Sequence, residues 1–202
     1  MMASPPAIQK VLVALDGSPA AATALPFART LAARLAARVE VVHCVEDPMT
    51  GSALEQAVRQ ALRPDEALQL RPAHGAPENG ILEAAADPTV VLLVLTTHGR
   101  VIEPGRHLGR TAEAVLAAVS LPVLLVRPEA AVSPEGQRAL ALRRWLVPLD
   151  GAPATAAALP PAGDLARRLG ASVDLLLVAP PTRPPVVERG AITAPRYVDQ
   201  PQ

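Results

Sequence analysis

The sequence predicts a doubly wound α/β fold, in which a parallel sheet carries helices on both faces. Two observations predict it: short apolar runs alternate with stretches of helical periodicity, and one β-α-β unit occurs twice. Such alternation indicates parallel strands joined by right-handed crossovers. Apolar residues make up 50% of the 202 positions and are almost all aliphatic, so we expect a core of Val, Leu, Ile and Ala.

The internal repeat is visible without gaps. Val11–Pro19 (VLVALDGSP) recurs as Trp145–Pro153 (WLVPLDGAP), and the match continues to Val39 and Val173. Asp, Gly and Pro fall in register, which duplication explains better than a shared Ala and Leu bias. We therefore expect one complete domain and a truncated second copy. The expected boundaries are a domain over 1–128, a linker over 129–142, the second copy over 143–179 and a loose Pro-rich tail over 180–202.

Apolar runs and helical spacing place the individual elements. The predicted strands of the complete domain are Lys10–Leu15, Val39–Val45, Leu68–Pro72, Thr89–Thr96 and Pro122–Val126. The first predicted helix begins after Ser18. The other predicted helices are Ser52–Leu62, Pro77–Ala86 and Gly109–Val119. The second copy supplies strands 145–149 and 173–178 around a helix over 153–169.

Pro26 and its counterpart Pro160 stand inside helical patterns. A proline in a regular helix interior costs about 3 kcal/mol, so we expect a kink or a late helix start in both copies.

Composition excludes several functional classes. The net charge is zero, no basic stripe is present and aromatics are scarce, so we expect no nucleic-acid partner. A single cysteine offers neither a disulfide nor a metal-ligand cluster. Residues 1–10 lack an apolar signal region, and the run Val90–Leu95 is far shorter than the roughly 20 residues of a membrane helix. We expect a soluble cytoplasmic protein without a membrane partner.

Two loops carry the candidate chemistry, because ligands of doubly wound sheets bind at the carboxyl ends of strands. Asp16, Gly17 and Ser18 follow the first strand, and residues 96–100 follow the fourth and lead to Gly109. Gly109 permits close approach of a ligand, and the following helix offers free N–H groups and a positive dipole end suited to phosphate. Nearby positive charge comes from Arg100, Arg106, His107 and Arg110. On these residues alone, a solvated loop with turn glycines is an equally good interpretation.

The motifs in this order resemble the universal stress protein family. They are Asp16-Gly17-Ser18, Thr97-His98-Gly99, Gly109 before an Ala-Glu-Ala-Val-Leu helix, and Pro122–Val126. The resemblance covers residues 8–128, and its first third recurs over 143–179. It implies a five-stranded sheet of order 3-2-1-4-5, as in adenine nucleotide alpha hydrolases. It also implies ATP, with Mg²⁺ bridging the phosphates, and a homodimer formed through the last strand.

The family's ATP-binding members carry Gly, two residues, Gly, nine residues, Gly, then Ser or Thr. Here those positions hold Thr96, Gly99, Gly109 and Arg110, and Thr111 follows. Two positions match and two depart. Thr96 adds a side chain where backbone contact with the nucleotide is expected. Arg110 replaces a small hydroxyl with a cation that could reach the phosphates or point to solvent.

The resemblance also assigns roles to residues at the strand ends. Asp16 would lie near the ribose and phosphates, Ala14 and Leu15 would line the base pocket, and Cys44 would form its wall. The residues by themselves allow plainer interpretations: Asp16 as a turn residue and Cys44 as a small apolar side chain. By the same reasoning, we expect His43 to pack or to cap a strand end rather than to act as a base.

The leading hypothesis is a stress-response regulator that binds ATP and acts through partners. A non-binding interaction module with a degenerate site is one alternative. A slow ATPase is another, and it would need a positioned base or water-orienting residue, for which only Asp16 and His98 are available. The second copy holds Asp150 but no equivalent of Gly99 or Gly109. We therefore expect it neither to bind nucleotide nor to fold alone, and to pack on the first domain or on a dimer mate.

Overall fold

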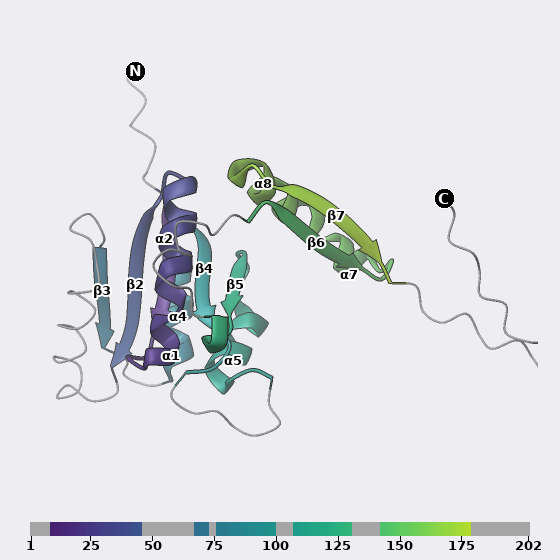
Figure 1. The fold of residues 1–202 in the computed structure, drawn as a ribbon. Helices are drawn as coiled ribbons and strands as arrows, with labels where there is room; N and C mark the ends of the chain where they lie inside the picture. Colours follow the sequence, from purple (N-terminus) through teal and green to yellow (C-terminus); the bar gives the residue numbers. More distant parts are fainter. Residues whose placement is uncertain (1–8, 46–66, 73–75, 100–106, 131–141, 179–202) are drawn as a thin grey trace, which may run out of the picture.

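The computed structural model describes residues 9–45, 67–72, 76–99, 107–130 and 142–178 (Figure 1). Five parallel strands form one sheet in the order β3-β2-β1-β4-β5, as expected. They are β1 (Lys10–Leu15), β2 (Arg38–Val45), β3 (Ala67–Pro72), β4 (Val90–Thr96) and β5 (Val123–Val126). Each bound agrees with its predicted value to within one residue, although β2 and β3 interleave charged and polar residues with apolar ones.

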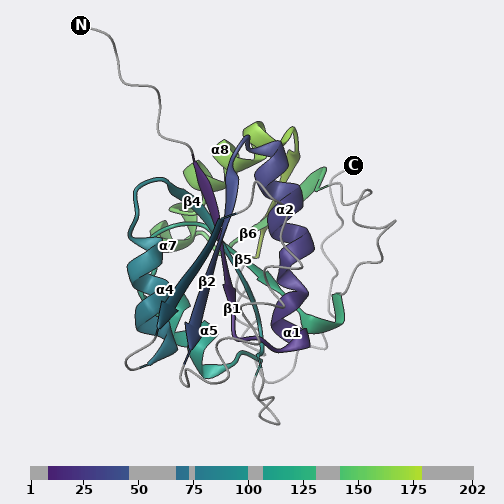
Figure 2. The ribbon, with the colours of Figure 1, turned by 90° about the vertical axis from the view of Figure 1, so that its left-hand side faces the viewer.

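Helices cover both faces of the sheet, which Figure 2 shows nearly edge-on. On one face, α2 (Ala24–Arg34) packs through Leu25, Ala28 and Leu31 on Val11, Val13 and Val39. On the other face, α4 (Pro77–Ala85) and α5 (Arg110–Ala118) cover the side chains that point the opposite way, among them Leu12, Val42 and Leu93. A 3₁₀ turn, η1 (Pro128–Ala130), follows β5. The predicted helix over 52–62 lies outside the described residues.

The helix after β1 is interrupted, as the proline pattern predicts. A short α1 (Pro19–Ala22) ends at Thr23, and α2 begins at Ala24. Pro26 thereby falls in the first turn of α2, where a missing N–H removes no intrahelical hydrogen bond. The second repeat has the same break, between α7 (Pro153–Ala156) and α8 (Leu159–Leu169).

The second repeat forms a small sheet of its own. Its strands β6 (Arg144–Leu149) and β7 (Ser172–Leu177) pair in parallel, and no described strand joins them. Leu165 and Leu169 of α8, with Trp145 of β6, pack against the core cluster on the α2 side of the first sheet. The Arg168 guanidinium also donates a hydrogen bond to Gln9. The second repeat therefore uses the first domain as a packing partner, as expected.

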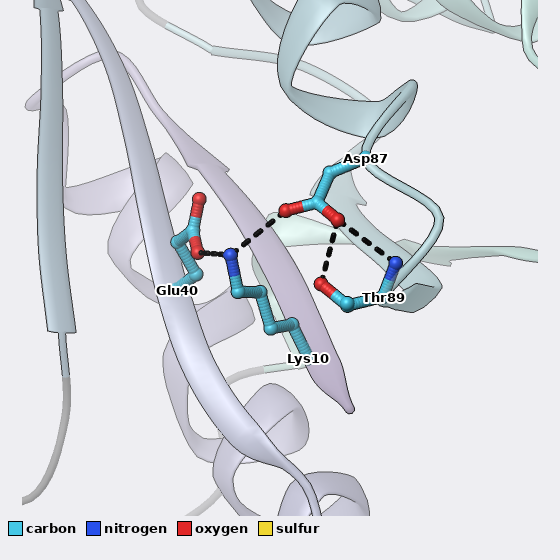
Figure 3. A network of polar contacts seen from close by, with 4 residues as sticks. All are labelled: Lys10, Glu40, Asp87 and Thr89. Atoms are coloured by element: carbon cyan, nitrogen blue, oxygen red, sulfur yellow. Dashed lines mark hydrogen bonds and ion pairs between the residues drawn. The ribbon is translucent and has the colours of Figure 1, made fainter. Parts of the chain in front are cut away.

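A polar network closes the amino end of the large sheet (Figure 3). Lys10 Nζ lies 2.8 Å from Glu40 Oε2 and 2.8 Å from Asp87 Oδ2. The other Asp87 oxygen accepts hydrogen bonds from the Thr89 backbone N–H at 2.8 Å and hydroxyl at 2.7 Å. Hydrogen bonds from Lys10 and Thr89 hold the pKa of Asp87 well below its usual range, and the two carboxylates raise the pKa of Lys10. The network joins β1, β2 and the turn before β4.

Candidate functional site

The carboxyl ends of β1 and β4 meet where the strand order reverses, and they bring Asp16 against Gly99. The strands are neighbours in the sheet, and each candidate loop begins as its strand ends. A Cβ placed on Gly99 would lie 2.2 Å from Asp16 Oδ2 and 3.1 Å from its Cγ. The Asp16 carboxylate therefore lies directly against the Gly99 backbone, and a side chain at Gly99 would displace it.

The turn after β1 holds Asp16 in place. Its Oδ1 accepts hydrogen bonds from the Ser18 backbone N–H at 2.9 Å and from the Ser18 hydroxyl at 2.6 Å. Ser18 Oγ in turn accepts from the Ala21 N–H at 3.1 Å and caps α1. Gly17 takes a φ of 81°, which glycine adopts without steric penalty. Asp16 is thus a turn residue through Oδ1, while its Oδ2 is directed at the loop after β4.

The N-terminus of α5 returns to the end of β4. The Thr97 N–H donates to the Val126 carbonyl at 2.8 Å, and the Gly109 N–H donates to the Thr97 carbonyl at 2.8 Å. A Cβ on Gly109 would lie 3.4 Å from that same carbonyl oxygen. The φ of Gly109 is −69°, so any residue could adopt its backbone conformation. A Cβ would also lie 3.7 Å from the His98 Cα, so neither the dihedral angle nor the packing of the described atoms excludes a side chain here.

The first turn of α5 presents the expected anion-binding elements. Gly109 is the N-cap and supplies no side-chain cap to the helix N–H groups. Arg110 follows at the first helical position and is exposed, and Thr111 is half-buried. The positive charge of Arg110 is unfavourable next to the positive end of the helix dipole. A bound anion would be stabilised by the dipole and by Arg110 together.

The structure separates the residues expected to form the base side of the site. Ala14 is half-buried beside the α4 and α5 core, but the Leu15 side chain is only 6% exposed and packs in the α2 core. The Leu15 carbonyl accepts a hydrogen bond from Nδ1 of the buried His43 at 2.6 Å. Cys44 follows His43 on β2, and its side chain is not among those described.

The remaining motif residues line the end of β4. Thr96 is buried at 7% exposure in the last position of the strand. Thr97 and His98 are half-buried, and His98 Nδ1 lies 3.2 Å from Thr97 Oγ1. Arg100 and Arg106 lie outside the described residues. The structure thus brings together Asp16, Gly99, Thr97 and Gly109, with Arg110 at the margin.

The model of the universal stress protein family matches residues 7–127. That range contains both candidate loops and all five strands of the large sheet. The chain belongs to the universal stress protein family. The match ends before β6, so the second repeat lies outside it.

Solved structures of universal stress proteins are similar to this chain. One, described in complex with cAMP, is 27% identical, covers 60% of this chain and 98% of its own, and has a TM-score of 0.48. One from Burkholderia pseudomallei is 26% identical and covers 61% and 98%, with a TM-score of 0.43. One from Archaeoglobus fulgidus in complex with dAMP is 20% identical and covers 58% and 96%, with a TM-score of 0.43. No curated protein matches the chain. No described helix is long and apolar enough to cross a membrane.

Two residues make contacts at the candidate site that sequence reasoning did not predict. Ser18 is predicted as a helix cap and as part of the loop after the first strand, and the structure adds that its hydroxyl donates a hydrogen bond to Asp16 Oδ1. His43 is predicted to pack or to cap a strand end, and the structure adds that its buried ring donates a hydrogen bond to the carbonyl of Leu15, the residue before Asp16. A polar side chain at the carboxyl end of an otherwise apolar strand was the available signal for His43.

Proposed function

We propose that this universal stress protein binds ATP at the carboxyl ends of β1 and β4 and acts as a stress-response regulator through partners. The contact between Asp16 and Gly99 carries the proposal, because it joins the two loops on which the site depends. The bond from Gly109 to Thr97 adds the N-terminus of α5 to the same place. Family membership supports the choice of a nucleotide.

The residues present fit such a ligand. The Asp16 carboxylate would accept hydrogen bonds from ribose hydroxyls or, with the phosphates, hold Mg²⁺, which prefers oxygen ligands. The uncapped first turn of α5 and Arg110 would receive the phosphate groups. The half-buried Ala14 would contact the base. The buried Leu15 would support this wall from behind instead of lining it.

The test compares equivalent positions of the two repeats. Calorimetry measures ATP affinity for the parent, Asp16→Ala, Gly99→Ala and Asp150→Ala. Asp150 occupies the same turn in the second repeat but faces no glycine loop among the described residues, so its replacement should leave affinity unchanged. Asp16→Ala should weaken ATP binding by at least about tenfold, because one hydrogen bond to a charged group is lost. Gly99→Ala should have an effect of the same size, because the added methyl group displaces the Asp16 carboxylate. No binding by the parent at millimolar ATP, or equal affinity in all four proteins, would contradict the proposal.

Arg110 distinguishes phosphate contact from a surface role. If its guanidinium contacts phosphate, Arg110→Ala should weaken ATP by about 1.5–3 kcal/mol and leave adenosine affinity unchanged. Calorimetry with the two ligands checks this difference. An equal loss for ATP and adenosine would place Arg110 away from the phosphates.

A second candidate function is an interaction module whose nucleotide site is degenerate. The departures at Thr96 and Arg110 favour it, since two of four motif positions differ from the ATP-binding pattern. Mass spectrometry of the purified protein separates the candidates: retained ATP supports the first, and an empty site that also fails to bind added ATP supports the second. The homodimer through β5 that the resemblance implies stays a prediction.

A further inference from the structure

The two edges of the small sheet differ in their capacity to pair with another strand. The Ser172 N–H donates to the Arg143 carbonyl at 2.8 Å, and the Val178 N–H donates to the Leu149 carbonyl at 2.7 Å. Parallel pairing alternates along each strand, so the even-numbered residues of β7 direct their backbone groups to β6. Residues 173, 175 and 177 then direct their N–H and carbonyl groups to the outer edge of β7.

The outer edge of β6 is blunted. By the same alternation, Arg144, Leu146 and Pro148 face that edge. Pro148 has no N–H and interrupts the row of donors that an added strand would need. In the first repeat the equivalent position is Ala14, and there the edge of β1 pairs with β4. Pro148 is tolerated because no described strand pairs with that edge of β6 and needs the N–H that proline lacks.

The outer edge of β7 has no such protection. The strand Ser172–Leu177 (SVDLLL) contains no proline, and β6 is the one described strand that pairs with it, so its outer edge has no partner among the described strands. Leu175 and Leu177, which lie on that edge, are 59% and 66% exposed. In the first repeat the equivalent strand, β2, pairs with β3 along its outer edge, and the equivalent residues Val41 and His43 are 0% and 1% exposed. A long apolar edge strand of this kind favours pairing with another chain.

We propose that β7 pairs antiparallel with β7 of a second copy of this chain, about a two-fold axis at Leu175. The resulting sheet would have the order β6-β7-β7-β6 and would cover Leu175 and Leu177 of both copies. Asp174 is the one charged residue of the strand. In this register it lies opposite Leu176 of the second copy, so like charges do not face each other across the pair. An isologous contact of this kind closes without a further molecule.

Sedimentation of the full-length protein over a range of concentrations tests the contact. The parent should self-associate, and Leu175→Pro should weaken that association by at least about tenfold, because it removes an outward N–H without removing a bond to β6. Leu146→Pro is the matched control: it makes the same change in an equally exposed leucine, at the edge that Pro148 already blunts, and association should persist. Leu175→Lys tests the edge without a proline, in case Leu175→Pro unfolds the repeat.

A cysteine pair locates the contact. Directly opposite hydrogen-bonded residues have Cα atoms about 5.5 Å apart, within disulfide range. In a Cys44→Ser background, oxidised Leu175→Cys should form a covalent dimer, whereas Leu146→Cys should not. A monomeric parent, or self-association that Leu175→Pro and Leu175→Lys leave unchanged, would overturn the proposal and, in the second case, point to β5. Failure of the ATP test would leave this result unaffected.

Discussion

The two repeats have the same local geometry in different surroundings. Asp16 and Asp150 each accept a backbone hydrogen bond from the residue two positions later, at 2.9 Å and 2.8 Å. The glycines that follow them, Gly17 and Gly151, have φ values of 81° and 84°. Where Ser18 is replaced by alanine in the second repeat, the Thr155 hydroxyl donates to Asp150 at 2.6 Å instead. These turns are therefore specified by residues close in sequence.

Burial differs between the repeats at equivalent positions. Leu12 is 0% exposed and Leu146 is 62% exposed; Val42 is 1% exposed and Leu176 is 45% exposed. The first repeat has β3, β4, α4 and α5 around it, and the second has no described equivalent of these elements. Local sequence thus specifies the shape of a β-α-β unit, while its stability depends on the neighbours that cover it.

The largest expected difference is between the two leucines. Leu12→Ala should reduce the free energy of unfolding by about 2–5 kcal/mol, since it leaves a cavity in a closed core. Leu146→Ala should change it by no more than about 0.5 kcal/mol, because the side chain is already in water. Denaturant titration of both variants measures the difference. Similar losses would mean that the outer face of the small sheet is covered in solution.

An ion pair occurs at equivalent positions of both repeats, and the two pairs should differ in strength. The Lys10–Glu40 pair has side chains 31% and 9% exposed, whereas the equivalent Arg144–Asp174 pair, at 2.9 Å, has side chains 80% and 48% exposed. Lys10→Met should cost about 1–3 kcal/mol because it leaves a buried carboxylate without its cation. Arg144→Met should cost less than about 0.5 kcal/mol, since exposed pairs contribute little. Denaturant titration of both variants at neutral pH measures the two losses, and equal losses would contradict the comparison.

The Lys10 network also predicts how stability changes with pH. Its hydrogen bonds lower the pKa of Asp87 from the ordinary 3.8, so this contribution is present above that pH and is lost as the pH falls further. The pKa of Lys10 is raised from 10.5, so its contribution is present below that pH and is lost as the pH rises through the folded value. In Lys10→Met, part of the acid-dependent loss of stability should disappear. An unchanged acid limb would exclude Lys10 as the cause of the Asp87 shift.

The smallest expected effect concerns the ends of the two long helices. Ala36 has a φ of 51°, and its counterpart Gly170 has a φ of 66°. Each lies in the same kind of helix C-terminal turn. The Ala37 N–H donates a hydrogen bond to the Ala32 carbonyl at 2.9 Å, and the Ala171 N–H donates one to the Ala166 carbonyl at 2.8 Å. Left-handed backbone costs alanine more than glycine.

Ala36→Gly should therefore stabilise the protein by about 0.5–1 kcal/mol, and Gly170→Ala should destabilise it by about 1 kcal/mol. Nothing lies within 4 Å of a Cβ at Gly170, so the second change tests conformation without a steric clash. Thermal melts of the two variants should shift in opposite directions. A shift in the same direction would show that the dihedral angle does not control these helix ends.

Sequence reasoning located the strands and described helices because their apolar periodicity is clear, and it placed the helix break because Pro26 and Pro160 occupy equivalent positions. It brought Asp16 and Gly99 to one edge of the sheet, since carboxyl ends of parallel strands share an edge. It did not predict that the Leu15 side chain would pack in the α2 core. The alternation of side chains along a strand identifies two faces, but it does not say which face the ligand contacts. The binding roles of the site residues, and the inability of the second repeat to fold alone, stay predictions.

Trp145 lies at the junction between the repeats and is the chain's single tryptophan. Its indole packs against the same core cluster that α2 and β1 complete, so the hydrophobic interior is continuous from one repeat to the other. A continuous interior couples the two units, because separating them would expose part of the first domain's own core. The tryptophan fluorescence of the protein therefore reports on that junction. A change in emission during unfolding would show whether the two repeats separate before, or together with, the unfolding of the first domain.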